Sequence, residues 1–312
     1  MAVINASDVD TAIDFARPGK ARSLWSDAWS RLRRNKLALG GAIVLLLLAA
    51  VALAAPVIAP YPYDKTVRDP VTKKVVPNLP PAWAPGGKAQ YLFGTDEQSR
   101  DEFSRVVYGA RISLSVGLVS QIIILCIGIP MGLIAGYYGK GVDMVLMRIT
   151  DIMYAFPTVL FAVVILAALG PSLFNIYAAI GFTFWPPMAR LVRSQVLSLK
   201  EKEYVEAAQA IGVKPGRIMF AQILPNALGP IIVAVTFGIP FAILIEAFLS
   251  FIGIGVPIPI PSWGAMIARG RDQLRSDPWL IMFPSIALSL TLFAFNFFGD
   301  GLRDALDPRS RR

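Results

Sequence analysis

The chain has 312 residues, a net charge of +9 and a mean hydropathy of +0.58; 55% of its residues are hydrophobic and 16% are charged. In an ordinary soluble protein roughly a quarter of the residues are charged. The present composition therefore indicates a membrane protein and excludes a soluble domain or a disordered chain. One cysteine, Cys126, and no histidine exclude a disulfide framework, Cys- or His-ligated metal sites and imidazole-dependent catalysis.

Stretches without charge locate the membrane-spanning helices, because roughly 20 apolar residues cross the hydrocarbon core. A basic segment at residues 1–36 precedes the first span, expected at 37–59. Within that segment, one helical face carries Trp25 and Trp29 beside arginines, which favours a helix lying in the membrane interface; a solvated basic anchor is the alternative. A proline-rich loop at residues 60–111 follows, and its prolines favour an extended segment that wraps a neighbour.

The second span is expected at residues 112–139. Residues 152–189 are uncharged for longer than one helix needs, and the turn residues 170–172 divide them into a third and a fourth span. The fifth span lies within residues 218–245, and the sixth is expected at 278–299. The sequence therefore predicts six transmembrane helices.

The uncharged residues 247–268 are expected to form a loop. Their first turns continue the fifth span, but glycine or proline then occupies every second position from Gly253 to Pro261. Alternate prolines are incompatible with a helix. We interpret the stretch as an ordered loop, either outside the membrane or re-entrant; a seventh span is the alternative.

Lysine and arginine indicate the orientation. Most of them lie in residues 1–36, in the 190–217 loop and after residue 300, which all fall on one side of a six-span chain. The positive-inside rule places that side, with both termini, in the cytoplasm. Juxtamembrane basic residues also account for the net charge, so no nucleic-acid partner is expected.

The most informative cytoplasmic segment is residues 201–217. Its first half consists of strong helix formers with acidic residues at the start, and Gly212 is a helix stop. Pro215 is well placed to begin a second short helix. Two short helices between two spans predict a protruding knob, and its alanines leave a shallow face that fits a groove in a partner protein.

This segment resembles the EAA loop of ABC importer permeases, which docks onto the ATP-hydrolysing subunit. The residues that match the motif are Glu206-Ala207-Ala208, Gly212 and Leu224-Pro225. Further blocks resemble the peptide/nickel permease branch, of the dipeptide and oligopeptide C-subunit type. They are Phe93-Gly94-Thr95-Asp96, Arg100-Asp101, Gly136-Tyr137-Tyr138-Gly139, Ala155-Phe156-Pro157 and Pro261-Ser262-Trp263-Gly264. Ser99 departs from the pattern, because the branch usually has Gly before Arg-Asp.

The resemblance implies an all-α membrane protein with the type I ABC importer permease fold. It implies a five-helix permease core at 112–303, a cytoplasmic coupling loop at 200–225 and a cytoplasmic tail at 304–312. The residues expected to couple to an ATPase are Glu206, Ala207, Ala208, Gly212, Arg217, Leu224 and Pro225. Separately, Gly128, Gly132 and Gly136 form a stripe that lets another helix approach closely, either within this chain or in a partner.

The implied function is a permease subunit of a binding-protein-dependent importer of di- or oligopeptides in a bacterial or archaeal cytoplasmic membrane. The implied partners are a homologous permease in a heterodimer, two ABC ATPases, an extracytoplasmic substrate-binding protein and the bilayer. No cofactor is expected. No Gly-Lys pair is followed by Ser or Thr, so no phosphate-binding loop is present and ATP hydrolysis is expected in the partner subunits rather than in this chain.

Two alternatives stay open. Glu246 lies in an apolar stretch and could carry a proton, which would suit an ion-coupled secondary carrier. Such a carrier usually holds both repeats in one chain, whereas six spans are about half the customary pathway. Within the importer interpretation, nickel chelates or glutathione are alternatives to peptides.

Overall fold

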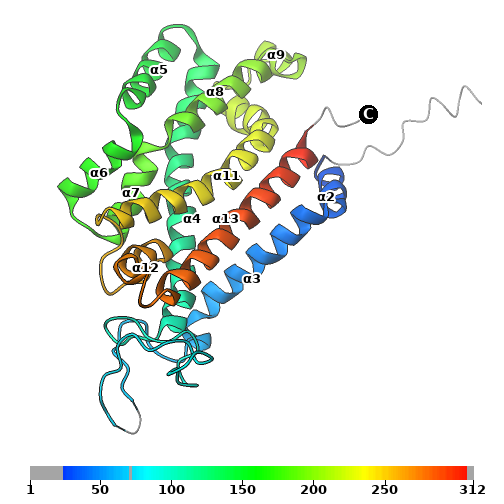
Figure 1. Ribbon diagram of the computed structural model, residues 1–312. Coiled ribbons are helices and arrows are strands. Elements are labelled where there is room, and N and C mark those ends of the chain that lie inside the picture. Colours follow the sequence, from blue (N-terminus) through cyan, green and yellow to red (C-terminus); the bar gives the residue numbers. More distant parts are fainter. Residues whose placement is uncertain (1–23, 70–71, 308–312) are drawn as a thin grey trace, which may run out of the picture.

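The computed structural model describes residues 24–69 and 72–307, which form a bundle of helices (Figure 1). Residues 1–23 and 308–312, parts of the N-terminal segment 1–36 and of the tail 304–312, lie outside the described residues. The long helices are α3 (Lys36–Ile58), α4 (Glu102–Tyr138), α11 (Leu224–Phe251) and α13 (Trp279–Leu306). The shorter ones are α2 (Leu24–Arg34), α5 (Lys140–Ala155), α6 (Thr158–Leu169), α7 (Leu173–Thr183), α8 (Pro186–Leu199), α9 (Glu203–Ala210), α10 (Pro215–Ile218) and α12 (Trp263–Gly270).

Helix α4 runs through the middle of the bundle (Figure 1) and packs against α3, α7, α8 and α11. It begins at Glu102, inside the expected loop 60–111, because Asp101 caps it by accepting a hydrogen bond from the Ser104 backbone N–H at 2.7 Å. It ends at Gly139, whose φ of +64° stops the helix. One helix therefore extends between the two ends of the molecule.

Helices α3 and α13 lie side by side along much of their length (Figure 1). A Cβ atom at Gly41 would lie 2.7 Å from the Ala294 carbonyl oxygen, so the glycine permits close backbone contact. Helix α2 packs the buried side chains of Ala28 and Leu32 against Ala305 of α13. The two ends of the described chain therefore lie together, at what we call the terminal end. Residues 60–69 and 72–101 lie at the opposite, distal end (Figure 1).

Four helical segments are long and apolar enough to cross a membrane: Lys36–Ile58, Glu102–Tyr138, Pro215–Phe251 and Trp279–Leu306. Helices α5 and α6 qualify as a fifth only as a pair, since they bend by 82° at a break that contains Pro157. Proline disfavours helical backbone in the residue before it, which explains the break after Ala155. The structure thus shows four or five candidate spans among the described residues, fewer than the six expected from the sequence.

The expected third and fourth spans are interrupted helices. The break at residues 170–172 is confirmed: α6 ends at Leu169 and Ser172 caps α7 by accepting from the Asn175 backbone N–H. Helix α7 is only 11 residues long, and α8 then begins at Pro186. The sequence predicted that the fourth span continues without interruption to residue 189. The paired prolines at 186–187 instead begin a new helix.

The loop expected within residues 247–268 is confirmed in its central part. Helix α11 ends at Phe251, and residues 252–262 are not helical. The sequence reading missed α12, which begins after Ser262 caps it by accepting from the Ala265 backbone N–H at 3.1 Å. Helix α12 is short, and its buried Trp263 packs in a cluster with residues of α3, α4, α11 and α13, so the segment packs onto the bundle.

The described part of the 60–101 segment folds over its own chain. Tyr91 is almost fully buried and its hydroxyl donates to the Arg68 carbonyl at 3.1 Å. Phe93 stacks on Phe283 of α13, with ring centroids 3.9 Å apart, and Trp83 contacts both rings edge-on. These contacts are within the segment or with α13 of the same chain, whereas the sequence suggested an extended segment that wraps a neighbour.

The glycine stripe of α4 faces α8 of the same chain. A Cβ atom at Gly132 would lie 2.5 Å from the Ala189 carbonyl oxygen, and one at Gly128 or Gly136 would come within 2.8 Å of Met188 or Val196. Of the two partners that the sequence left open, the stripe contacts the one within this chain. The α4–α8 contact is the most extensive between any two helices of the described chain.

We expect Gly132→Val to destabilise the folded protein by about 2 kcal/mol, because overpacked side chains force the two helices apart. Gly40→Val is the matched control, since nothing lies within 4 Å of a Cβ atom at that exposed position of α3. Thermal unfolding of the detergent-solubilised protein measures both. Equal stability of the two variants would contradict the close α4–α8 packing.

Candidate coupling site

Helices α9 and α10 form a knob at the terminal end of the bundle (Figure 1). One face of α9 is anchored: Val205 is fully buried and Ala208 nearly so, in a cluster with Val196 of α8 and Ile218 of α10. The sequence-predicted residues Glu206 and Ala207 lie on the exposed face of the same helix. The knob is therefore a fixed extension of α8 with one free side.

Gly212 sets the turn between the two short helices. Its φ is +78°, and its N–H donates to the Gln209 carbonyl at 3.0 Å. The Val213 N–H donates to the Ala208 carbonyl at 3.0 Å, which completes a Schellman cap. An L-residue in this backbone conformation costs roughly 1–2 kcal/mol, so glycine is favoured here. Pro215 then begins α10 at its first position, as the sequence predicted.

A wide helical turn connects the knob to α11. Residues Met219–Ile223 form a π-helical turn that the sequence gave no means of finding. It buries Met219 and Ile223 in the same cluster that holds α9. The predicted residues Leu224 and Pro225 form the first turn of α11 directly after it. They lie at the base of the knob, whereas Arg217 lies in the last turn of exposed α10.

The exposed side of the knob carries several large apolar side chains. Ile211 is 81% exposed, Phe220 is 59% exposed and Tyr204 is 43% exposed. Ala207 and Ala210 between them are small and exposed, and exposed apolar patches of this kind mark interaction sites. The sequence had indicated the alanines but not the large side chains; only Ile211, directly before the helix-stop Gly212, had a local signal. Within the described ranges no group of three or more His, Cys, Asp or Glu could hold a metal ion.

Two ion pairs attach α5 to the helix that carries the knob. Arg193 of α8 makes two hydrogen bonds to Asp143, each at 2.5 Å, and Arg190 contacts Asp151 at 2.6 Å. The first pair is bidentate and partly buried, which makes it the stronger of the two. Lys200, at the end of α8, also donates to the Gly136 carbonyl of α4 at 3.2 Å. These contacts attach the helix that carries the knob to α5 and to the end of α4.

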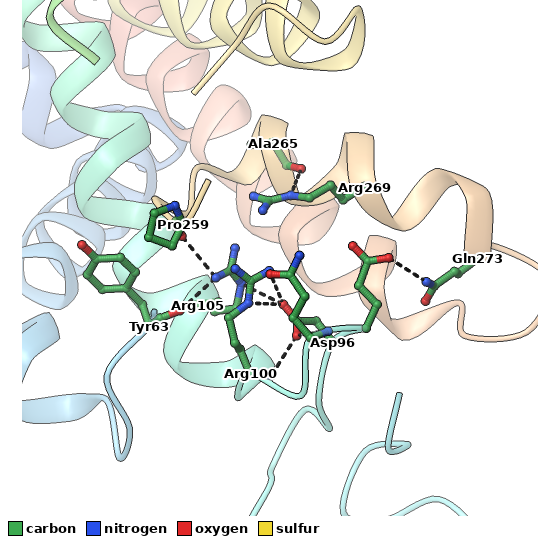
Figure 2. Close-up of polar contacts among 10 residues, drawn as sticks. Tyr63, Asp96, Arg100, Arg105, Pro259, Ala265, Arg269 and Gln273 are labelled. Atoms are coloured by element: carbon green, nitrogen blue, oxygen red, sulfur yellow. Dashed lines mark hydrogen bonds and ion pairs between the residues drawn. The ribbon is translucent and has the colours of Figure 1, made fainter. Parts of the chain in front are cut away.

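A second polar cluster lies at the distal end (Figure 2). Asp96 accepts from the Arg100 Nε at 2.7 Å and contacts Arg105 at 3.4 Å, and all three side chains are largely buried. Arg105 donates to the Tyr63 carbonyl at 2.9 Å, so it ties the 60–101 segment to α4. In the sequence, Asp96 and Arg100 were notable only for their resemblance to the family pattern. Their structural role is to hold the distal segment on the bundle.

Glu246 of α11 is fully buried. Its Oε1 accepts hydrogen bonds from the hydroxyls of Ser250 and Ser262, each at 2.7 Å. Ser262 also caps α12, so the carboxyl group joins the end of α11 to the start of α12. This arrangement is a structural bridge between the two helices.

Comparison with known proteins identifies the family. Residues 128–312 match the binding-protein-dependent transport system inner membrane components, and residues 23–81 match the N-terminal transmembrane domain of oligopeptide transport permease C. The chain belongs to this family of ABC importer permeases.

The similarity to individual relatives extends over almost the whole chain. A dipeptide transport system permease protein DppC of Alkalihalophilus pseudofirmus is 45% identical over 93% of this chain and 92% of its own length. An oligopeptide transport system permease protein OppC of Bacillus subtilis is 44% identical over 94% and 92%. In Escherichia coli, an OppC is 41% identical over 94% and 93%.

A solved structure supports the fold. An inward-facing structure of the MetNI methionine ABC transporter matches with a TM-score of 0.54 at 19% identity, over 65% of this chain and 96% of that one. At this identity the match concerns the fold alone. It agrees with an all-helical permease whose core covers about two thirds of the present chain.

The backbone at Ser99 gives one test of the distal cluster. Its φ is +58°, in the left-handed region that glycine adopts without strain. We expect Ser99→Gly to stabilise the protein by about 0.5–1 kcal/mol. Ser198→Gly, in α8, should instead destabilise it by a similar amount. Thermal unfolding of both variants checks the signs, and a destabilised Ser99→Gly would contradict the assigned strain.

The bridge at Glu246 gives a second test. We expect Glu246→Gln to retain transport close to wild type, because its amide oxygen can still accept from Ser250 and Ser262. Glu246→Ala should lower stability by about 1–3 kcal/mol, since it leaves two buried hydroxyls without their acceptor. Transport assays and thermal unfolding on both variants separate the effects. A complete loss of transport in a stable Glu246→Gln protein would favour a proton carrier instead.

Proposed function

We propose that this chain is a permease subunit of a binding-protein-dependent ABC importer of short peptides. The observation that carries the proposal is the knob of α9 and α10, which is anchored in the bundle core and exposes an apolar side. It bears the Glu206-Ala207-Ala208 and Gly212 pattern of the coupling loop. The names of the relatives support peptides as the substrate, and they favour neither an ion-coupled carrier nor a nickel-chelate or glutathione importer.

The proposed topology has six crossings with both termini in the cytoplasm. Four crossings are the long spans, the bent pair α5–α6 is another, and α7 with α8 forms the last. The placement of basic residues supports a cytoplasmic terminal end. The knob lies at that same end (Figure 1), where it could meet a cytoplasmic ATPase.

The proposed partners follow from this arrangement. A homologous permease completes the pathway as a heterodimer, and two ATPase subunits supply ATP hydrolysis. A substrate-binding protein docks on the extracytoplasmic distal end, formed by the 60–101 segment and the 252–277 region. Together they constitute a multi-pass complex in the cytoplasmic membrane.

The mechanism we infer is alternating access. Closure of the two ATPases displaces the knob, and the buried contacts of Val205, Ala208 and Ile218 pass the displacement to α8 and α11. Gly212 fixes the angle between α9 and α10. A docking surface can transmit force only if it does not deform, and both the cap and the anchored face of the knob give it that stiffness.

We expect Gly212→Asp to abolish peptide transport while leaving membrane insertion intact, because it strains the turn and adds a charge to the docking side. Glu206→Lys should act similarly by reversing a charge there. Gly141→Asp is the control, since Gly141 is exposed in α5 with nothing within 4 Å of a Cβ atom.

The readouts are peptide uptake and recovery of the ATPases with the tagged chain. Gly212→Asp should lose both, and Gly141→Asp neither. Full transport by Gly212→Asp or Glu206→Lys would refute the coupling assignment.

A further inference from the structure

A small cavity at the distal end lies between the start of α4, the 94–101 loop and α12. Its volume is about 20 Å³, and it opens partly to solvent. Because one water molecule needs roughly 10–15 Å³, this cavity has room for one or two water molecules or for one monatomic ion, and it is too small for a peptide. The lining residues are Asp96, Glu97, Arg100, Glu102, Arg105, Met266, Arg269, Gly270, Gln273 and Leu280.

Three guanidinium groups meet in this lining, those of Arg100, Arg105 and Arg269 (Figure 2). Asp96 is the buried carboxylate beside them. It accepts a hydrogen bond from the Arg100 Nε at 2.7 Å and contacts Arg105 at 3.4 Å. Glu97 is exposed, so water screens its charge at the rim of the cavity.

Glu102, the remaining acidic residue of the lining, does not balance these charges. Its side chain is only 2% exposed, and no hydrogen bond within the described chain engages its carboxyl group. It lies at the first residue of α4, before the second span expected at residues 112–139. Burial raises the pKa of this carboxyl group to about 8. At pH 7 it is therefore mostly protonated, and the buried part of the lining carries a surplus of positive charge.

Arg269 has hydrogen-bond donors that the chain does not use. Its Nε donates to the Ala265 carbonyl at 3.0 Å, but its two terminal nitrogens are buried without a hydrogen-bond partner in the described residues (Figure 2). The pKa of its guanidinium group is lowered, first by burial and then by the positive charge of Arg100. A buried ion without hydrogen bonds is costly, and the terminal N–H groups of a guanidinium form a fork that suits an anion.

We propose that this cavity binds a single monatomic anion, chloride, through the terminal nitrogens of Arg269 and the positive charges of Arg100 and Arg105. Chloride agrees with the cavity in size, in sign and in the donors that it requires. A water molecule fits the space but leaves the positive charge uncompensated, and a metal cation has the wrong sign. Because Arg269 belongs to α12 and Arg105 to α4, the ion joins these helices at the distal end. The inference does not depend on the proposed function.

The first test compares anions by thermal unfolding of the full-length protein, purified in detergent from its native membrane. Sodium chloride or sodium bromide replaces sodium gluconate at constant ionic strength and pH 7. Both halides should raise the unfolding temperature in a saturable manner, because a ligand that binds only the folded state stabilises it. An unfolding temperature that is the same in gluconate and in chloride would overturn the inference.

The second test removes the unused donors. Arg269→Gln should weaken the apparent chloride affinity at least about tenfold, since hydrogen bonds to a charged partner are lost. Arg271→Gln is the matched control, because Arg271 follows α12 directly but is exposed and contacts Asp272. This control should bind chloride like the wild type. Equal chloride affinities of Arg269→Gln and the wild type would show that the stabilisation arises elsewhere and would overturn the site.

The dependence on pH supplies a readout that does not require the Arg269 variant to fold. The charged groups around Glu102 are Arg105, Asp96, Arg269 and Asp101. Between pH 7 and pH 9 Glu102 ionises and adds a negative charge beside the anion, so the chloride affinity of the wild type should fall several-fold. Glu102→Gln stays neutral and should bind chloride equally at both pH values. A wild-type affinity that rises toward pH 9, or an equal fall in Glu102→Gln, would contradict the proposed site.

Discussion

The close contact between α4 and α8 is the constraint on which the rest of the structure depends. Three glycines on α4 bring the backbones so near that a single added Cβ atom would clash with α8. Helix α8 continues directly into the knob, and Lys200 ties its end to α4. Because interiors are close-packed, this contact cannot slide gradually. The knob is therefore attached to both helices.

The same helix carries the distal cluster at its other end. Glu102 and Arg105 lie in the first turns of α4, and Gly132 and Gly136 lie in its last turns. One continuous helix thus joins the distal cluster to the end that carries the knob, over a length of 37 residues. The bridge made by Glu246 keeps α12, which carries Arg269, attached to α11.

Much of this could be predicted from the sequence, for identifiable reasons. Charge-free stretches located the long spans, and Gly212 and Pro215 gave the two helices of the knob because their backbone preferences are local. The break at residues 170–172 followed from the same turn chemistry. The bend of 82° between α5 and α6 was not predicted, since hydrophobicity does not reveal which prolines interrupt a helix and which, like Pro130 in α4, are tolerated within it.

The distal cavity was beyond sequence reasoning because its residues come from separate segments. Arg269 lies far along the chain from Glu102, and nothing in their spacing indicates that they share a cavity. The α4–α8 contact could be predicted only in part. The glycine stripe predicted a close helix neighbour, but the identity of that neighbour depended on the fold. Local preferences therefore gave the elements, while long-range packing decided the sites.

The most direct measurement is a site-specific crosslink from the knob. Ile211→Cys, placed in a Cys126→Ser background, puts the sole cysteine of the chain at an 81% exposed position of the proposed docking side. The tagged complex is treated in its native membrane with a short thiol-to-amine crosslinker, and the product is identified by mass. A crosslink to an ABC ATPase subunit is the expected result. An intact complex that contains the ATPases but crosslinks at residue 211 only to another membrane subunit would contradict the coupling role of the knob.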